Sequence, residues 1–216
     1  MRVVQAGYEI LDDLNGVDIL KKTEKVARTC YKSEDKASEG SAEKLVRALI
    51  KSKHEAMLEH FSFSVKFTVD RGISHEIVRH RLASYAQEST RYCNYSKDGF
   101  GREITVIEPC YLAKGSKAYE GWEYICNMAE QAYFYLLGWG CTPQEARAVL
   151  PTCLKTEIVM SANLREWRHF LNLRAVGTTG VPHPQIREVA VPLLKELRER
   201  VPVIFDDLVL PEESTE

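Results

Sequence analysis

The chain has 216 residues, of which 44% are hydrophobic and 28% charged, and its formal net charge is −2 at pH 7. This composition is typical of a globular protein and excludes a disordered or fibrous chain. We expect no membrane-spanning helix, because no run of about 18 apolar residues is present, and no bulk electrostatic binding of nucleic acid. The N-terminus carries no secretory signal and the six cysteines are scattered, so we expect reduced thiols in a cytoplasmic protein.

Helices are predicted where apolar residues recur every three or four positions, and strands where they alternate with polar residues. The clearest strand covers 61–69, in which Phe and Val alternate with Ser, Lys and Thr. The apolar residues that we expect to face the core from the helix over 116–138 are Trp122, Ile125, Ala129, Tyr133 or its neighbour Ala132, and Leu136. In chain order, the predicted elements are an edge strand over 2–7, a helix over 20–31, a loop over 32–40, a helix over 41–53 capped by Ser41, the strand over 61–69, a turn over 70–72, a helix over 73–80, an irregular segment over 81–102, a β-prone segment over 103–108, helices over 116–138, 142–150, 163–173 and 183–200, and a frayed tail over 211–216.

Repeats, linkers and low-complexity stretches are absent from the sequence, so we expect a single domain over 1–216 with mixed helix and strand. The segment 81–102 holds almost no aliphatic residue after Leu82. A segment of this kind in the middle of a domain is typical of a functional loop.

Arginines gather at the start of this loop, where Arg79 and Arg81 are followed by Gln87, Ser89 and Arg91. Arginine binds phosphate through paired, charge-assisted hydrogen bonds, and hydroxyl and amide groups can complete such a site. The segment therefore predicts a site for a phosphorylated ligand. A solvated basic turn would have the same composition.

A second polar cluster lies on the helix predicted over 163–173. Arg165 and His169 are four residues apart and share one helical face, and Asn163 and Arg174 are almost three whole turns apart. Apolar residues such as Trp167 supply the packing on the remaining face. This polar edge either lines a pocket or faces water.

Two other patterns resemble reactive sites but lack a necessary feature. His54 and His60 are six residues apart, whereas a zinc-binding helix needs histidines four residues apart, so we expect no metal site. Cys153 follows Leu-Pro-Thr, but a nucleophilic cysteine needs a partner base and a positive environment. The pattern favours a structural thiol.

Arg79-His80-Arg81, followed after seven residues by Ser89, resembles the RHR-x7-S signature of the flavin-dependent thymidylate synthases. Four further blocks resemble that family in the same order along the chain: His54-Glu55 with Glu59-His60, Glu145-Ala146-Arg147 with Leu150-Pro151, Asn163-Leu164-Arg165 with His169-Phe170 and Leu173-Arg174-Ala175, and His183-Pro184-Gln185-Ile186-Arg187.

The resemblance implies an enzyme that makes dTMP from dUMP. It implies methylenetetrahydrofolate as carbon donor, NADPH as reductant and FAD as bound cofactor. It also implies an α+β fold, with a central antiparallel sheet flanked by helices, and a homotetramer whose active sites combine residues from several chains.

The same resemblance implies roles for individual residues. The residues implied to bind dUMP are Glu76, Arg79, Gln87, Glu88, Ser89, Thr90, Arg91, Arg147 and Arg174. The residues implied to bind FAD are Ala56, Arg79, His80, Arg81, Gln87, Asn163, Arg165 and His169. Arg174 is the implied catalytic residue, because a cation beside the pyrimidine stabilises an ionised uracil whose carbon 5 can accept the one-carbon unit without a cysteine nucleophile.

Three positions depart from the family pattern. Ala56 and Ala86 stand where many members carry a side chain that can hydrogen-bond, and Glu88 replaces a residue that is often apolar. We expect Ala56 to contact flavin through its backbone alone and Glu88 to contact dUMP through its backbone alone.

Two alternatives belong to other classes. One is a cysteine-dependent pyrimidine methyltransferase with Cys153 as nucleophile, which would need no flavin. The other is a non-catalytic module that binds nucleotide or RNA through the segment 79–91, and its binding would fall steeply with salt.

Overall fold

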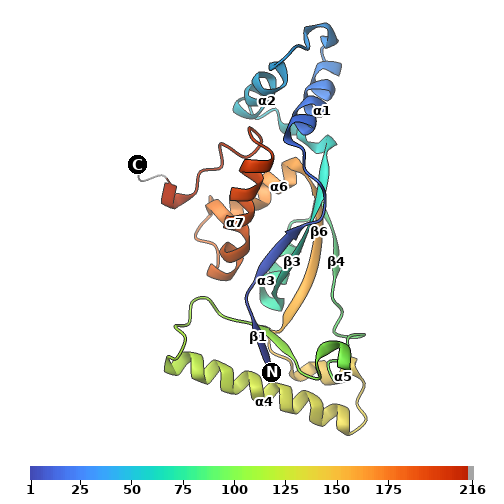
Figure 1. The fold of residues 1–216 in the computed structure, drawn as a ribbon, viewed down its shortest axis with the longest axis vertical. Helices are drawn as coiled ribbons and strands as arrows, with labels where there is room; N and C mark the ends of the chain where they lie inside the picture. The colour runs from blue at the N-terminus through green and yellow to red at the C-terminus, as the bar shows by residue number, and fades with distance from the viewer. Residues whose placement is uncertain (214–216) are drawn as a thin grey trace. The chain divides into compact units, whose positions relative to one another are not determined.

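A computed structural model of the chain describes residues 1–213, so the predicted fraying of 211–216 lies partly outside the described residues. Its strands are β1 Arg2–Val4, β2 Gly7–Ile10, β3 Ser62–Asp70, β4 Ala83–Gln87, β5 Thr105–Ile107 and β6 Lys155–Asn163 (Figure 1). Its helices are α1 Gly16–Thr29, α2 Ser41–Lys51, α3 Arg71–Ile77, α4 Lys117–Gly138, α5 Pro143–Ala146, α6 Leu164–Leu171 and α7 Pro184–Arg200. Short 3-10 turns cover Glu34–Lys36, Glu55–His60, Asp98–Phe100, Arg147–Val149 and Pro211–Glu213, and a π-helical turn covers Asn172–Val176.

The chain divides into two compact units, each made of separated stretches of sequence. The first unit comprises Met1–Gly7, Phe67–Arg79 and Tyr85–Val159. The second comprises Tyr8–Lys66, His80–Ser84 and the chain from Met160 onward. The boundaries fall within β3, β4 and β6, so each of these strands contributes residues to both units.

The main sheet has four strands in the order β2-β3-β6-β4. Its two central strands run antiparallel, since Leu164 N donates to Phe61 O at one end of the pair and Arg71 N donates to Leu154 O at the other. A second sheet pairs β1 with β5 in parallel. The mixed fold with an antiparallel sheet and helices confirms the expected α+β class.

Both central strands pass directly into a helix. Asp70 ends β3 and its Oδ1 accepts from Ile73 N at 2.6 Å, while Asn163 ends β6 and its Oδ1 accepts from Glu166 N at 2.9 Å. Both caps have φ −78° and ψ 167°, and each satisfies a free amide of the first helical turn. The turn predicted over 70–72 is therefore wrong, because Asp70 starts a helix at the next residue.

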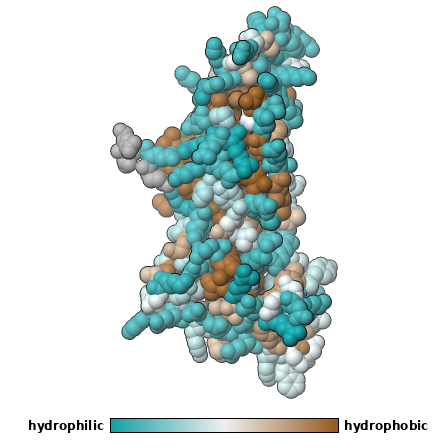
Figure 2. Space-filling model, in the orientation of Figure 1, coloured by the Kyte–Doolittle hydropathy of each residue, from teal (hydrophilic) through white to brown (hydrophobic). Residues whose placement is uncertain are grey.

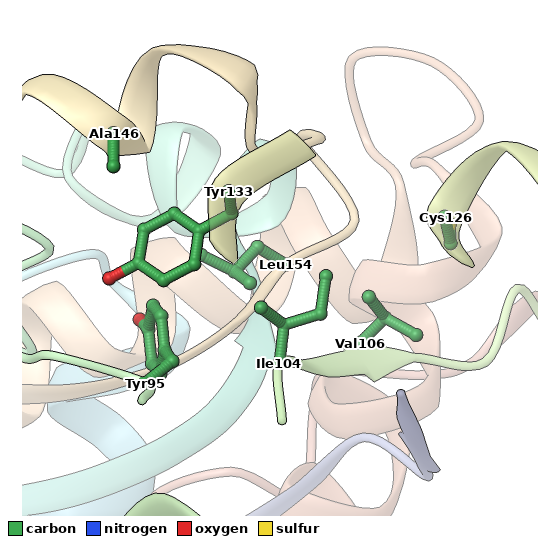
Figure 3. Close-up of a cluster of buried hydrophobic side chains, with 7 residues drawn as sticks. All are labelled: Tyr95, Ile104, Val106, Cys126, Tyr133, Ala146 and Leu154. Carbon is green, nitrogen blue, oxygen red and sulfur yellow. The ribbon is translucent and has the colours of Figure 1, made fainter. Parts of the chain in front are cut away.

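A hydrophobic cluster forms the core of the first unit (Figure 3). It consists of Tyr95, Ile104, Val106, Cys126, Tyr133, Ala146 and Leu154. Helix α4 contributes Cys126 and Tyr133 to this cluster, whereas Ile125 is 61% exposed. The prediction that Ile125 faces the core is therefore wrong. At this turn of α4 the buried side chain is that of the next residue, Cys126.

The second unit has its own core. Trp167 of α6 stacks on Phe63 of β3 with ring centroids 4.9 Å apart, and its Nε1 donates to Phe63 O. The buried Arg168 guanidinium pairs with Glu55 and Asp207. These contacts fix the face that α6 turns inward, and they leave Arg165 and His169 exposed.

The sequence patterns predicted some elements and missed others. The strand over 61–69, the long helix over 116–138 and the last helix are confirmed, as is the Thr142 capping box with Glu145. Strand β4 lies in the segment expected to be irregular, and β6 was not predicted. Ser41 is the first residue of α2 rather than its cap, because Gly40, with φ 73°, holds that position.

On the face shown in Figure 2, hydrophilic residues predominate and hydrophobic ones gather in patches. None of the helices in residues 1–213 combines the length and hydropathy that a bilayer crossing requires.

Candidate functional site

Arg174 lies in the π-helical turn that follows α6, and it makes a direct contact with the histidine of the Arg79-His80-Arg81 motif. Its Nε donates to His80 Nε2 over 3.2 Å. The His80 side chain is only 2% exposed, and its ring meets the Phe170 ring edge-on at 5.0 Å. Two predicted site residues that are 94 positions apart in sequence are therefore in contact within the second unit.

The surroundings of His80 keep its imidazole neutral. Burial, the Arg174 guanidinium and His169 together lower the pKa of His80 from 6.5 to about 4. Glu166 Oε1 lies 3.5 Å from His80 Nδ1, and burial raises the pKa of the Glu166 carboxyl. A neutral imidazole can accept the hydrogen bond from Arg174, which a protonated one could not.

His80, Glu166 and His169 also have the composition of a metal site, because their ligand atoms all lie within 4.8 Å of one another. His169 is exposed, and its ring centroid lies 5.5 Å from that of His80. A divalent cation here would meet the positive charge of Arg174, which already donates to His80. The charge arrangement favours an anionic or electron-rich ligand beside Arg174.

A cavity of about 280 Å³ opens elsewhere in the second unit. It is lined by Ala27, Cys30, Tyr31, Leu49, Lys53, His54, Glu55, Ala56, Met57 and Arg165. Two of these, Ala56 and Arg165, are predicted flavin contacts, and Arg165 also pairs with Glu59 at 2.6 Å. Apolar walls with a few cationic groups are typical of a site for a flat ring and its phosphates, and the size suits part of a dinucleotide.

In the first unit, the chain leaving β4 carries the predicted nucleotide loop. Gln87 Nε2 donates to Ser74 Oγ at 2.8 Å and lies 3.3 Å from Thr156 Oγ1, so its amide is oriented by α3 and β6. Arg147 Nη1 donates to Thr90 Oγ1 at 3.0 Å. The structure thus brings two residues predicted to bind dUMP, Thr90 and Arg147, into contact.

Glu88 is held by its backbone and its side chain. Its N donates to Glu157 O at 2.9 Å, its carboxylate pairs with Lys155 at 3.1 Å, and the Tyr95 hydroxyl donates to it at 3.1 Å. Burial and this carboxylate raise the pKa of Tyr95. These partners occupy the side chain of Glu88 and explain how a carboxylate is accommodated at a position that is often apolar in the family.

The remaining predicted residues are placed on surfaces of both units. Glu76 is half-buried on α3, and Arg79 and Arg81 are exposed on the segment that follows it. Ser89 Oγ accepts from Arg91 N at 3.3 Å, and Arg91 is exposed. The side chain of Asn163 caps α6, so this residue has a structural role in addition to the predicted flavin contact.

Cys153 lies beside a second thiol. Its Sγ is 3.4 Å from Sγ of Cys126, a member of the hydrophobic cluster of the first unit, and Cys153 packs against that cluster. The hydrogen bond between the thiols lowers the pKa of Cys153 and, as the largest cause, raises that of Cys126. A thiol packed among apolar side chains lacks the positive environment of a nucleophilic cysteine.

The predicted site residues thus form two groups, one in each unit. Sequence reasoning did not identify Glu166 or Lys155, although each lies against a predicted residue. Glu166 could have been suspected because it is three residues before His169, on the same helix. No sequence pattern pointed to Lys155, because Glu88, with which it pairs in the structure, is distant from it in sequence.

Comparison with known proteins was made at the level of family, sequence and structure. The family model described as "Thymidylate synthase complementing protein" matches residues 15–203. A flavin-dependent thymidylate synthase of Geobacter sulfurreducens is 32% identical over 188 residues, which cover 84% of this chain and 78% of that protein. One of Corynebacterium glutamicum is 31% identical over 220 residues, covering 94% and 84%.

A solved structure shares the fold. The UMP/dUMP methylase PolB from Streptomyces cacaoi, bound with 5-Br dUMP, superposes with a TM-score of 0.79 at 22% identity and covers 98% of this chain. The family match, the identities and the shared fold agree with the motif order along the sequence. The chain belongs to the family of the flavin-dependent thymidylate synthases, which are methyltransferases.

Proposed function

We propose that this protein makes dTMP from dUMP, with methylenetetrahydrofolate as carbon donor and NADPH as reductant through bound FAD. The observation that carries the proposal is the contact between Arg174 and a neutral, buried His80. This contact fixes the position of the Arg174 guanidinium, which is a permanent cation. The chain that carries it belongs to a family of thymidylate synthases. We further propose that residues 1–216 act as one domain.

In this proposal, Arg174 faces the pyrimidine and stabilises the negative charge that develops on uracil when N3 is ionised. A fixed donor of this kind contributes about 3–4 kcal/mol to the transition state in typical cases. Because the charge on uracil makes carbon 5 nucleophilic, no enzyme thiolate is required. Cys153, which packs against the hydrophobic cluster of the first unit, is not needed for the reaction.

The loop after β4 binds the phosphate and sugar of dUMP. Ser89, Thr90 and Arg91 supply hydroxyl and guanidinium donors, Arg147 orders Thr90, and Gln87 is oriented by hydrogen bonds of its own. Glu76 and Arg79 contribute from α3 and the segment after it. The backbone of Glu88 completes the loop.

The residues fit a flavin. The cavity lined by Ala56 and Arg165 can receive part of a dinucleotide, and cationic Lys53 and Arg165 are placed to bind its phosphates. We assign the remaining flavin contacts to His169 and to five further residues: Arg79, His80, Arg81, Gln87 and Asn163. When bound, the flavin would supply the hydride chemistry that no side chain can perform.

We propose that the enzyme is a cytoplasmic homotetramer with shared active sites. The two groups of site residues would then be supplied to each site by different chains. An exposed apolar stripe on and just after α4, which includes Ile125, Met128 and Trp139, supports assembly because such patches mark protein contacts.

The test is dTMP formation by the purified protein, with FAD and NADPH each omitted in turn. The proposal expects product only when both are present, and it expects a Cys153→Ser variant to keep its activity. Product without either cofactor, together with loss of activity in Cys153→Ser, would instead support the cysteine-dependent route. Nucleotide binding without product would support a non-catalytic module.

A further inference from the structure

Three side chains of the second unit form a line that ends at Arg174. Glu166 Oε1 lies 3.5 Å from His80 Nδ1, and the opposite ring nitrogen, Nε2, lies 3.2 Å from Arg174 Nε. The side chains of His80 and Glu166 are 2% and 6% exposed. Water therefore has little access to either contact.

The proton positions in this line follow from the hydrogen-bonding capacity of each group. Arg174 Nε always carries a proton, so it must donate, and His80 Nε2 must accept with its lone pair. A neutral His80 then carries its only ring proton on Nδ1. That nitrogen lies 3.5 Å from Glu166 Oε1, and the negative charge of the carboxylate favours a proton on the ring nitrogen nearer to it.

Three ionisable groups of the described residues are recorded close to His80. Glu166 and His169 belong to α6, and Arg174 belongs to the π-helical turn after it. The Arg174 cation disfavours a second positive charge on the imidazole. The Phe170 ring closes another side.

We propose that Glu166 is a positioning residue that fixes the guanidinium of Arg174 through the Nδ1–H tautomer of His80. This inference rests on the proposed function, from which Arg174 takes its place beside the pyrimidine. Without the Glu166 charge beside Nδ1, His80 can shift its proton to Nε2. The N–H groups of His80 Nε2 and Arg174 Nε would then point at each other, and the hydrogen bond that orients the guanidinium would be lost. Any interaction that depends on this orientation would weaken.

The first experiment measures dUMP affinity and flavin content in the purified flavin-loaded protein. Glu166→Met should weaken dUMP binding about five- to tenfold with flavin retained, and Glu166→Gln, which keeps an acceptor oxygen, should recover part of that loss. In an Arg174→Ala background, Glu166→Met should change dUMP affinity less than about twofold, because coupled residues are not additive.

A matched control separates positioning from structure. Glu24 is as buried as Glu166, lies in the same unit and pairs with Arg28. Glu24→Met should lower thermal stability and leave dUMP affinity unchanged. If Glu166→Met keeps wild-type affinity, or if its effect persists fully without Arg174, the relay is wrong.

A second measurement needs no variant. Neutron diffraction from crystals of the flavin-loaded enzyme near pH 7 locates the deuterium on His80. A deuterium on Nδ1 alone supports the inference, whereas one on Nε2 excludes it. If the wild-type protein binds no dUMP at all, the proposed function fails and the inference fails with it; normal dUMP binding with the opposite tautomer removes the inference alone.

Discussion

Arg174 is held by a neutral imidazole, which constrains the position of its charge without neutralising it. If this charge stabilises ionised uracil, Arg174→Ala should reduce dTMP formation about 100-fold or more, the usual effect of deleting one such donor. Flavin content should be unchanged. Product formation in a single turnover checks this. The control is Arg28→Ala, which removes an arginine that pairs with Glu24 and that we do not place in the site. Unchanged turnover in Arg174→Ala would remove this residue from the reaction.

His80 makes the stability of the protein depend on pH. Its pKa is about 4 in the folded state, against 6.5 for a free imidazole. The unfolded chain therefore binds more protons between these values, and stability should fall as pH falls from about 6.5 to 4, by about 3 kcal/mol at most. Denaturant unfolding across this range should show the loss.

Replacing the imidazole provides the control for this prediction. His80→Gln should flatten the dependence of stability on pH between 6.5 and 4, whereas replacement of the exposed His75 should not. An equally steep dependence in His80→Gln would assign the acid sensitivity to other groups.

At the scale of elements, Asn163 has one observed role, the cap of α6, and one proposed role, a flavin contact, and substitution can separate them. Its side chain caps α6, and an aspartate can make the same hydrogen bond. Asn163→Ala should therefore cost about 1 kcal/mol of stability while Asn163→Asp costs little. If flavin affinity falls in both variants, the amide group itself contacts the flavin; thermal unfolding and flavin titration together decide. Equal stability loss in both variants would contradict the capping role.

The start of the nucleotide loop is fixed by Glu88, through Lys155 and Tyr95. Removing the carboxylate in Glu88→Ala leaves both partners without this acceptor and loosens the residues that follow. We expect dUMP binding to weaken several-fold, since lost buried hydrogen bonds cost about 1–3 kcal/mol, part of which falls on stability. Flavin binding should be unchanged.

Isothermal titration with dUMP checks this prediction, and Glu157→Ala is a suitable control because Glu157 contacts the same lysine from a more exposed position. A fall in flavin affinity with normal dUMP binding would mean that the two ligands have been exchanged in the proposal.

Element prediction succeeded where one face of the element is buried. In β3 the alternation of Phe and Val with polar residues matches the buried and half-buried positions of the strand. Strand β4 has no fully buried residue, so its sequence carries no alternation of hydrophobicity. The missed β6 does alternate, with Thr156, Ile158, Met160 and Ala162 buried, and a period-two search would have found it.

At the scale of the whole molecule, local sequence patterns proposed candidate site residues but did not predict which residues meet. The contact of Arg174 with His80 joins positions far apart in the chain, and the contact of Glu88 with Lys155 does the same. Spacing rules describe neighbours on one helix or strand. Pairings across the fold depend on strand order and on the π-helical turn, which no local pattern predicted.

Assembly is the property at this scale that remains to be tested. Five large apolar side chains are exposed at near-helical spacing on and just after α4: Tyr124, Ile125, Met128, Tyr135 and Trp139. If this stripe lies in the interface of a homotetramer, the double substitution Ile125→Glu and Met128→Glu should produce smaller species. It should also reduce dTMP formation, because the proposed active sites combine residues from different chains.

Sedimentation velocity and an activity assay, made on the same samples, check this. Val181→Glu is the control, since Val181 is 96% exposed outside the stripe and a charge there should change neither assembly nor activity. Dissociation with full activity would place complete sites within single chains, and a wild-type monomer with full activity would contradict both the tetramer and the shared site. Assembly that resists both charges would place the interface elsewhere on the surface, because burying two glutamates in an apolar contact costs several kcal/mol.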